Sequence, residues 1–361
     1  MGVLVSGLRA YSSTDPFVGR VTVDNAFGLV FSGCHFAKLH TGIEFAGECR
    51  NLVLGDSHIY DCQEYCLRFA AGSDIHQFVA ANNHISYARV VVRYEDGEYG
   101  DHFYANNDFE ADTDAAQQQT IEQIVDIALT SGAFFASGFA NNTFEPHGQG
   151  TCIRATAPDT ASFRQNRIVN NTFTAAPDVA VDVSFAENLN IAENNISLCD
   201  ERAITLGGEL RNVNVSNNQI YGPAGDGIVV ETDEFTLNLR IDGNQFMSWD
   251  GRAVHMTELN SGTDMREISI NANIVFLGLS SSFNGQYVFD VNNDGGAVLN
   301  LHMMGNKMRG RDVGEAGFRV DSTSSTFDHL ILKNNIIEAN VTNARYSFPS
   351  ESSTIIVGDN I

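Results

Sequence analysis

The residues best suited to acid–base chemistry fall in successive or alternate copies of a segment that repeats along the chain. The catalytic candidates are Asp126, Asp182, Glu231, His255 and Asp290. Two carboxyl groups about 6.5–9.5 Å apart can hydrolyse a glycosidic bond with inversion, because one protonates the leaving oxygen while the other activates water. Arginines can hold the carboxylates of an acidic sugar bidentately. The arginines at the same position in other copies of that segment are Arg68, Arg93, Arg154 and Arg319, and they are the candidates for substrate binding.

Most of these candidates stand in the middle of an apolar–polar–apolar triplet, such as Leu67-Arg68-Phe69 or Val254-His255-Met256. Alternation with a period of two is typical of a β-strand whose outer triplet members face a core and whose middle member faces solvent. A further triplet, such as Leu52-Val53-Leu54, lies about half a repeat later. The candidates are therefore expected on strands, pointing outward.

A short phrase follows each of the later triplets: Asn-Asn or a substitute, one further residue, and usually Phe or Ile. Well-preserved copies are Ala81-Asn82-Asn83-His84-Ile85, Ala105-Asn106-Asn107-Asp108-Phe109 and Ala140-Asn141-Asn142-Thr143-Phe144. Twelve intervals between Cys34 and Asn360 give a mean of about 27 residues, and a period in the 20s indicates a solenoid.

Three short strands per repeat predict an all-β, right-handed parallel β-helix of about 12–13 coils, each about 4.8 Å above the last. Asn tolerates left-handed backbone angles at a tight corner, and its amide can hydrogen-bond to the Asn of the next coil, which predicts an Asn ladder. Only Ala115–Leu129 shows a possible helical pattern. Residues 1–361 are expected to form a single domain.

In such a solenoid the middle residues of the earlier triplets form one outward column. In chain order the column reads Glu44, Arg68, Arg93, Asp126, Arg154, Asp182, Thr205, Glu231, His255, Asp290 and Arg319. Asp126 and Asp182 would then lie about 10 Å apart on either side of Arg154, and His255 would lie between Glu231 and Asp290. The alternative is purely structural, because a stacked column mixes charge signs to avoid repulsion.

The Asn corners and the Phe and Ile ladders resemble the right-handed parallel β-helix, or pectin-lyase-like, superfamily over about Val3 to Ile361. This resemblance implies binding or cleavage of acidic polysaccharides, as in pectate lyases, polygalacturonases, alginate epimerases and bacteriophage tailspikes. The Gly-His-Gly and Arg-Ile-Lys motifs of polygalacturonases are absent. Phe144-Glu145-Pro146-His147 is similar to the Asp-Pro-His of alginate epimerases, with Glu replacing Asp; the alternative is a surface loop.

Composition excludes several classes of function. The chain carries 45 Asp and Glu against 21 Lys and Arg, a net charge of −24, which disfavours nucleic acid and anionic membranes as partners. No apolar run approaches a membrane span, and no signal peptide opens the chain. The six cysteines are expected to be buried, and neither a metal site nor a cofactor is predicted.

Apolar residues take the outward position of the later triplets near both ends, at Val53, Val79, Phe103, Ile331 and Ile356. Exposed apolar patches are usually covered, either by a local segment or by a homotrimer of parallel solenoids. The first residues already form a strand and the last ones an Asn phrase, so the coils at both ends of the solenoid are expected to expose strand edges and apolar side chains that need cover. We therefore expect a section of a longer protein or an assembly.

The sequence favours the carbohydrate-recognising β-helix of a phage tailspike-like receptor-binding protein. Its expected partners are a polysaccharide and two further copies of the chain, and its expected location is a virion tail or the extracellular space. Polysaccharide depolymerase activity, by hydrolysis or by a lyase reaction, is left open. The alternatives are a soluble polysaccharide lyase, C5-epimerase or glycoside hydrolase, and a non-catalytic structural module.

Overall fold

The computed structural model describes most of the chain, and every secondary-structure element in the described part is a β-strand. The described residues are 2–13, 17–111, 123–146, 150–160, 162–174, 178–197, 199, 201–222, 225–232, 234–249, 251–258, 264–277, 287–293, 297–309, 313–322, 326–338, 341–347 and 355–358. They form two compact units, Met1–Val183 and Ser184–Ile361. The expectation of a single domain over 1–361 stays a prediction.

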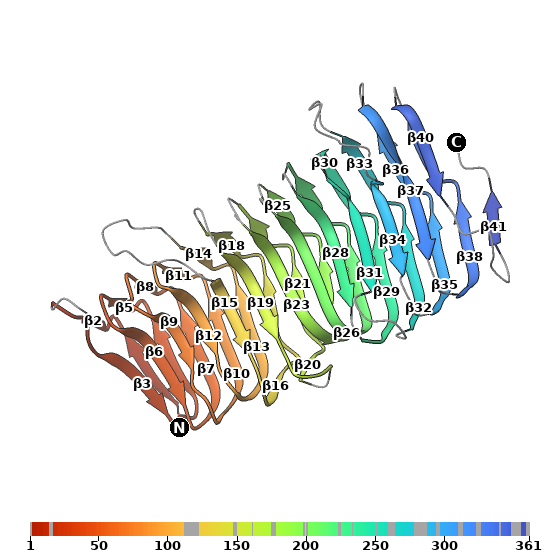
Figure 1. The fold of residues 1–361 in the computed structure, drawn as a ribbon. Coiled ribbons are helices and arrows are strands. Elements are labelled where there is room, and N and C mark those ends of the chain that lie inside the picture. Colours follow the sequence, from red (N-terminus) through yellow and green to blue (C-terminus); the bar gives the residue numbers. More distant parts are fainter. Residues whose placement is uncertain are drawn as a thin grey trace. The chain divides into compact units, whose positions relative to one another are not determined.

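Each coil of the first unit contributes to three rows of parallel strands (Figure 1). The first row consists of β3 (Arg20–Asp24), β6 (Thr41–Ala46), β9 (Tyr65–Phe69), β12 (Val90–Tyr94), β15 (Gln123–Ala128), β19 (Thr151–Thr156) and β23 (Val179–Glu187). The second row consists of β1 (Val3–Ser6), β4 (Leu29–Ser32), β7 (Glu48–Gly55), β10 (Ser73–Ala81), β13 (Gly97–Ala105), β16 (Gly132–Phe135), β17 (Gly138–Ala140), β20 (Phe163–Arg164) and β21 (Arg167–Val169). The short third row consists of β2 (Arg9–Tyr11), β5 (His35–Ala37), β8 (His58–Tyr60), β11 (His84–Ser86), β14 (Asp108–Glu110), β18 (Thr143–Glu145) and β22 (Thr172–Phe173).

The second unit repeats the same three rows. Its long strand β26 (Arg202–Ser216) serves the first row with one half and the second row with the other. The first row continues with β28 (Asp226–Thr232), β31 (Val254–Glu258), β34 (Phe289–Asn293), β37 (Val313–Ser322) and β40 (Val341–Ser347). The second row holds β24 (Asn190–Ala192), β29 (Thr236–Asp242), β32 (Met265–Asn271), β35 (Ala297–Met304), β38 (Thr326–Lys333) and β41 (Ile355–Gly358). The third row holds β25 (Asn195–Ser197), β27 (Gln219–Tyr221), β30 (Gln245–Trp249), β33 (Ile274–Leu277), β36 (Lys307–Arg309) and β39 (Ile336–Glu338).

The interior is built from the outer members of the triplets, as the alternation predicts. In the first unit Phe45, Phe69 and Tyr94 stack through successive coils, with ring centroids 5.0 and 4.2 Å apart. Phe109 and Phe144 form a second stack, with centroids 5.0 Å apart. In-register aromatic pairs of this kind stabilise neighbouring strands. The parallel register therefore places identical side-chain types on top of one another.

The Asn ladder is present in both units. In the first unit the Asn83 amide donates to the Asn107 side-chain oxygen at 2.9 Å, and the Asn107 amide donates to Asn142 at 3.0 Å. In the second unit the corresponding bonds join Asn194, Asn218, Asn244, Asn273, Asn306 and Asn335. The residue before a ladder Asn commonly has a positive φ, as at Asn82 (58°) and Asn106 (56°). The first Asn of each phrase therefore provides the left-handed corner of the backbone, and the second Asn forms the hydrogen bond to the neighbouring coil.

These observations confirm the all-β right-handed parallel β-solenoid and its Asn ladder. The possible helix at Ala115–Leu129 was wrong where it can be tested, because Gln123–Ala128 is the strand β15; residues 112–122 lie outside the described part. All six cysteines are buried, as their apolar character predicts. The described residues contain no helix long and apolar enough to cross a membrane.

Candidate functional site

The first-row column of the first unit is an ion-pair ladder centred on Asp126. Strand register places Arg93, Asp126 and Arg154 directly in line on β12, β15 and β19. One Asp126 carboxylate oxygen pairs with the Arg93 guanidinium, and the other accepts a hydrogen bond from Arg154 Nε at 3.0 Å. The Asp126 side chain is only 1% exposed. We call this Arg93–Asp126–Arg154 group the first clamp.

Asp126 is closed to a ligand in this conformation, since its side chain is only 1% exposed and each of its oxygens contacts a guanidinium. Asp182 lies half-buried on β23, the strand that pairs with β19. An acid–base role for Asp126 and Asp182 stays a prediction. Charge pairing also explains Arg68, which bridges Glu44 at 2.8 Å and Glu95 at 2.9 Å.

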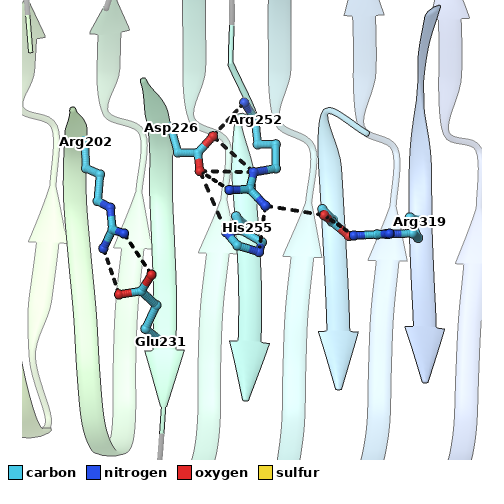
Figure 2. A network of polar contacts seen from close by, with 7 residues as sticks. Arg202, Asp226, Glu231, Arg252, His255 and Arg319 are labelled. Atoms are coloured by element: carbon cyan, nitrogen blue, oxygen red, sulfur yellow. Dashed lines mark hydrogen bonds and ion pairs between the residues drawn. The ribbon is translucent and has the colours of Figure 1, made fainter. Parts of the chain in front are cut away.

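The second unit holds a similar group, here called the second clamp: Arg252, Asp290 and Arg319. Asp290 is 3% exposed and accepts two hydrogen bonds from Arg319, each 2.6 Å long. Arg252 Nη1 lies 3.7 Å from the second Asp290 oxygen. Figure 2 shows Arg252 beside Asp226 and His255, and the ion pairs of Arg252 join it to both Asp226 and Asp290. The Asp226 carboxylate binds Arg252 through Nε and Nη2, the latter at 2.6 Å.

His255 adds a titratable group to the second clamp. Its Nε2 lies 2.9 Å from Arg252 Nη1. A guanidinium only donates hydrogen bonds, so Nε2 accepts, and the ring proton must reside on Nδ1. That nitrogen faces Asp226 Oδ2 at 3.7 Å, too long for a hydrogen bond. Burial, and then the charge of Arg252, lower the pKa of His255, so the ring is neutral at pH 7 with its proton directed toward a carboxylate.

The structure brings His255 and Asp290 together but places Glu231 elsewhere. His255 is the register partner of Asp290 on one side and of Val229, rather than Glu231, on the other. Glu231 lies two residues further along β28 and binds Arg202 through two hydrogen bonds of 2.8 and 2.9 Å. The expectation that Glu231 stacks next to His255 was wrong, because the apolar residue Val229 takes that position. In the run Ile228-Val229-Val230 the outward position cannot be distinguished by hydropathy.

The candidate at Glu145 is only partly described. Glu145 ends β18 and is half-buried; His147 lies outside the described residues. Within the described part of the chain, no three His, Cys, Asp or Glu side chains are grouped so that they could hold a metal ion.

The outward apolar residues of the second row form a continuous stripe in the first unit. Register aligns Leu4, Val30, Val53, Val79 and Phe103 through five coils. Leu4 is 67% exposed, and the others are half-buried. Ile331 is half-buried in the second unit, and the Ile356 side chain lies outside the described part.

A histidine stack on the third row was missed from the sequence. His35, His58 and His84 are register partners, and the His58 ring stacks on His84 with centroids 4.4 Å apart. Burial and the two neighbouring histidines lower the pKa of His58 to about 4. The signal was present, because two neighbouring Asn phrases carry His at the same place.

The rows of parallel strands and the Asn ladder define a right-handed parallel β-helix fold, and comparison with known proteins agrees. Residues 130–297 match the family model described as a right handed beta helix region. Among solved structures, the Dettilon tailspike protein (gp208) is similar, with a TM-score of 0.52 and 11% sequence identity. That match covers 88% of this chain and 61% of the tailspike chain, so this chain spans less than two thirds of it. A search of curated proteins gives no significant match. At this identity the likeness concerns the fold.

Proposed function

We propose that the chain is the carbohydrate-recognising β-helix of a tailspike-like receptor-binding protein, and that the second clamp with His255 contacts the saccharide. The observation that carries this proposal is the partly exposed group of Arg252, Arg319 and neutral His255, whose side chains are 27%, 28% and 13% exposed. The Arg319 guanidinium also lies 5.0 Å from the centre of the Tyr287 ring. Convergent polar groups beside an aromatic ring suit the binding of a sugar.

A depolymerase reaction would use the same groups. In this proposal His255 accepts a proton at Nε2 once the saccharide has displaced the Arg252 contact, and the Asp226 carboxylate, 3.7 Å from Nδ1, stabilises the charged ring. Asp126 and Asp182 form the competing catalytic pair. Cleavage that persists in both Asp126→Asn and Asp182→Asn would remove that pair from consideration, whereas loss with His255→Gln alone would support the second clamp.

Binding is tested by a glycan-array screen with the purified chain, followed by measurement of reducing-sugar release. We expect Arg252→Met and His255→Gln to weaken binding of any captured glycan by about tenfold, the effect of losing a charge-assisted hydrogen bond. Arg202→Met is the matched control, because Arg202 is also half-exposed and paired but lies outside the clamp. Equal loss in the control would contradict the assignment.

Assembly and location belong to the same proposal. The apolar stripe of the first unit supports a homotrimer in which each stripe is covered by a neighbouring copy, as expected for a virion-tail or extracellular protein. Multi-angle light scattering should report a trimer, and Val79→Asp should convert it to a monomer. A wild-type monomer would contradict this part.

One observation favours a second candidate, a non-catalytic structural module. The arginines expected to bind substrate already contact carboxylates: Arg68, Arg93, Arg154 and Arg319. No glycan binding combined with strong destabilisation on breaking a clamp would support this candidate.

A further inference from the structure

The third row of the first unit contains a hollow that neither clamp touches. Its volume is about 400 Å³, and the residues that line it include Arg9, Tyr11, His35, Ala37, Lys38 and Tyr60. Ligand pockets commonly begin at this size. The residues come from β2, β5, the turn after β5, and β8.

Strand register explains why a hollow forms there. Tyr11, Ala37 and Tyr60 are successive register partners, so a methyl group stands between two phenol rings. Beside them Arg9 is the register partner of His35. A small residue between large neighbours leaves space on a sheet surface that side chains otherwise fill.

The charge in this hollow is opposite to that of the chain as a whole. The chain carries 45 acidic and 21 basic residues, yet the described residues that line the hollow include Arg9, Lys38 and His35 and none that is acidic. Lys38 is one of only three lysines in the sequence. Clustered cations within an acidic protein create a local field that attracts an anion.

Arg9 and Lys38 differ from the clamp arginines in their pairing. In the described part of the chain neither Arg9 nor Lys38 forms an ion pair, whereas Arg154 and Arg319 are both paired. Arg9, His35 and Lys38 are exposed. Lys38 has a φ of 55°, a left-handed conformation that ends β5. The cations are therefore accessible and electrostatically unsatisfied.

We infer that this hollow is a binding site for an acidic sugar, with the carboxylate held by Arg9 and Lys38 and the ring placed between Tyr11 and Tyr60. Arg supplies a bidentate donor and Lys a point charge for the carboxylate. The tyrosines supply apolar ring faces with polar tips; Tyr11 is 72% exposed. The choice of a sugar rests on the proposed function, whereas the choice of an anion rests on the lining alone.

The test is isothermal titration calorimetry of the purified chain with trigalacturonate at low salt. The Arg9→Met/Lys38→Met double variant should lose about tenfold or more in affinity. Arg240→Met is the matched control, because Arg240 is also exposed and forms no ion pair within the described residues; its affinity should change less than about twofold. Ala37→Leu should also abolish binding by filling the hollow without altering charge.

Two further ligands test the chemistry. Methyl-esterified trigalacturonate lacks the charge and should bind about tenfold more weakly or not at all, whereas triglutamate keeps the charge without the rings and should bind weakly. Equal binding of ester and acid, or of triglutamate and sugar, would overturn the inference. So would a lack of trigalacturonate binding, or binding that the double variant leaves intact. Because Arg252→Met tests the second clamp separately, failure here is distinguishable from failure of the proposed function.

Discussion

The two units carry a similar Arg–Asp–Arg clamp, but among the described residues the histidine contact belongs to the second clamp, where Arg252 contacts His255. Among the described residues of the first unit, the ion pairs of Asp126 are those with Arg93 and Arg154. In the second unit Arg252 is shared between Asp290, Asp226 and His255. A clamp without a titratable neighbour can hold strands together but cannot exchange a proton near neutral pH. The addition of one histidine therefore separates a structural ladder from a candidate site.

The largest expected effect is loss of stability on removing the central carboxylate. Asp126→Asn should lower the free energy of unfolding by about 3 kcal/mol, because two guanidiniums lose their charge partner. Asp290→Asn should cost less, about 2 kcal/mol, since Arg252 keeps Asp226. Urea unfolding followed by hydrogen exchange in peptides from each unit measures both. A larger loss with Asp290→Asn would reverse the comparison.

The next effect is acid destabilisation of the first unit through its core. His102 is fully buried, with Nε2 2.9 Å from the Ile75 carbonyl and Nδ1 2.8 Å from the Tyr94 hydroxyl, and burial lowers its pKa to about 3. The unfolded state protonates first, so stability is complete above pH 6.5 and falls as the pH drops toward 3. Between pH 7 and 4.5 the loss should be about 2–3 kcal/mol.

The control for this effect is His102→Gln, which should be less stable at pH 7 but show a shallower pH dependence in first-unit peptides. An unchanged slope would mean that other groups dominate. The pKa of His58 is also lowered, so His58 also makes the first unit less stable in acid. Its contribution is the pH dependence of stability that remains in the variant.

A smaller effect of the same sign is expected in the second unit. The lowered pKa of His255 means that acid must protonate a ring beside the Arg252 guanidinium, so stability again falls below pH 6.5. Hydrogen exchange in peptides from Ser184–Ile361 measures the acid transition of this unit. His255→Gln should flatten its acid transition relative to wild type. If the transition does not move, His255 is not the group that distinguishes the clamps.

The smallest effect belongs to the exposed pair of Arg202 and Glu231. It has good geometry, but its side chains are 34% and 29% exposed. A double-mutant cycle with Arg202→Met and Glu231→Gln should give a coupling of about 0.2–1 kcal/mol, and 0.5 M salt should reduce it. A coupling energy as large as that of a clamp would show that side-chain exposure does not explain the difference in strength between this pair and the clamps.

The fold was predictable because each coil repeats one local solution. The Asn phrase specifies both the left-handed corner and the inter-coil hydrogen bond, so its spacing alone indicated the solenoid. The alignment of Arg93, Asp126 and Arg154 was predicted from alternation and is confirmed by strand register. Where polar and apolar residues alternate cleanly, the alternation alone predicts which side chains face outward.

The site was less predictable because its parts obey no periodicity. Asp226 begins β28, and Arg252 precedes β31, so neither is the middle of a triplet. The hollow at Ala37 depends on which residues stack above and below it, and that register cannot be read from one coil. Acid–base roles for Asp126, Asp182, Glu231, His255 and Asp290 stay predictions.

The Asn ladder has a consequence for how such a chain can change. Ladder partners are separated by 24 residues between Asn83 and Asn107 but by 35 between Asn107 and Asn142, and both amide bonds keep normal lengths of 2.9 and 3.0 Å. The Asn hydrogen bond thus restores the alignment of a coil with its neighbour, whether the preceding segment is short or long. An insertion or deletion in one loop is absorbed within its own coil, so surface loops can diversify independently while the neighbouring coils stay unaltered.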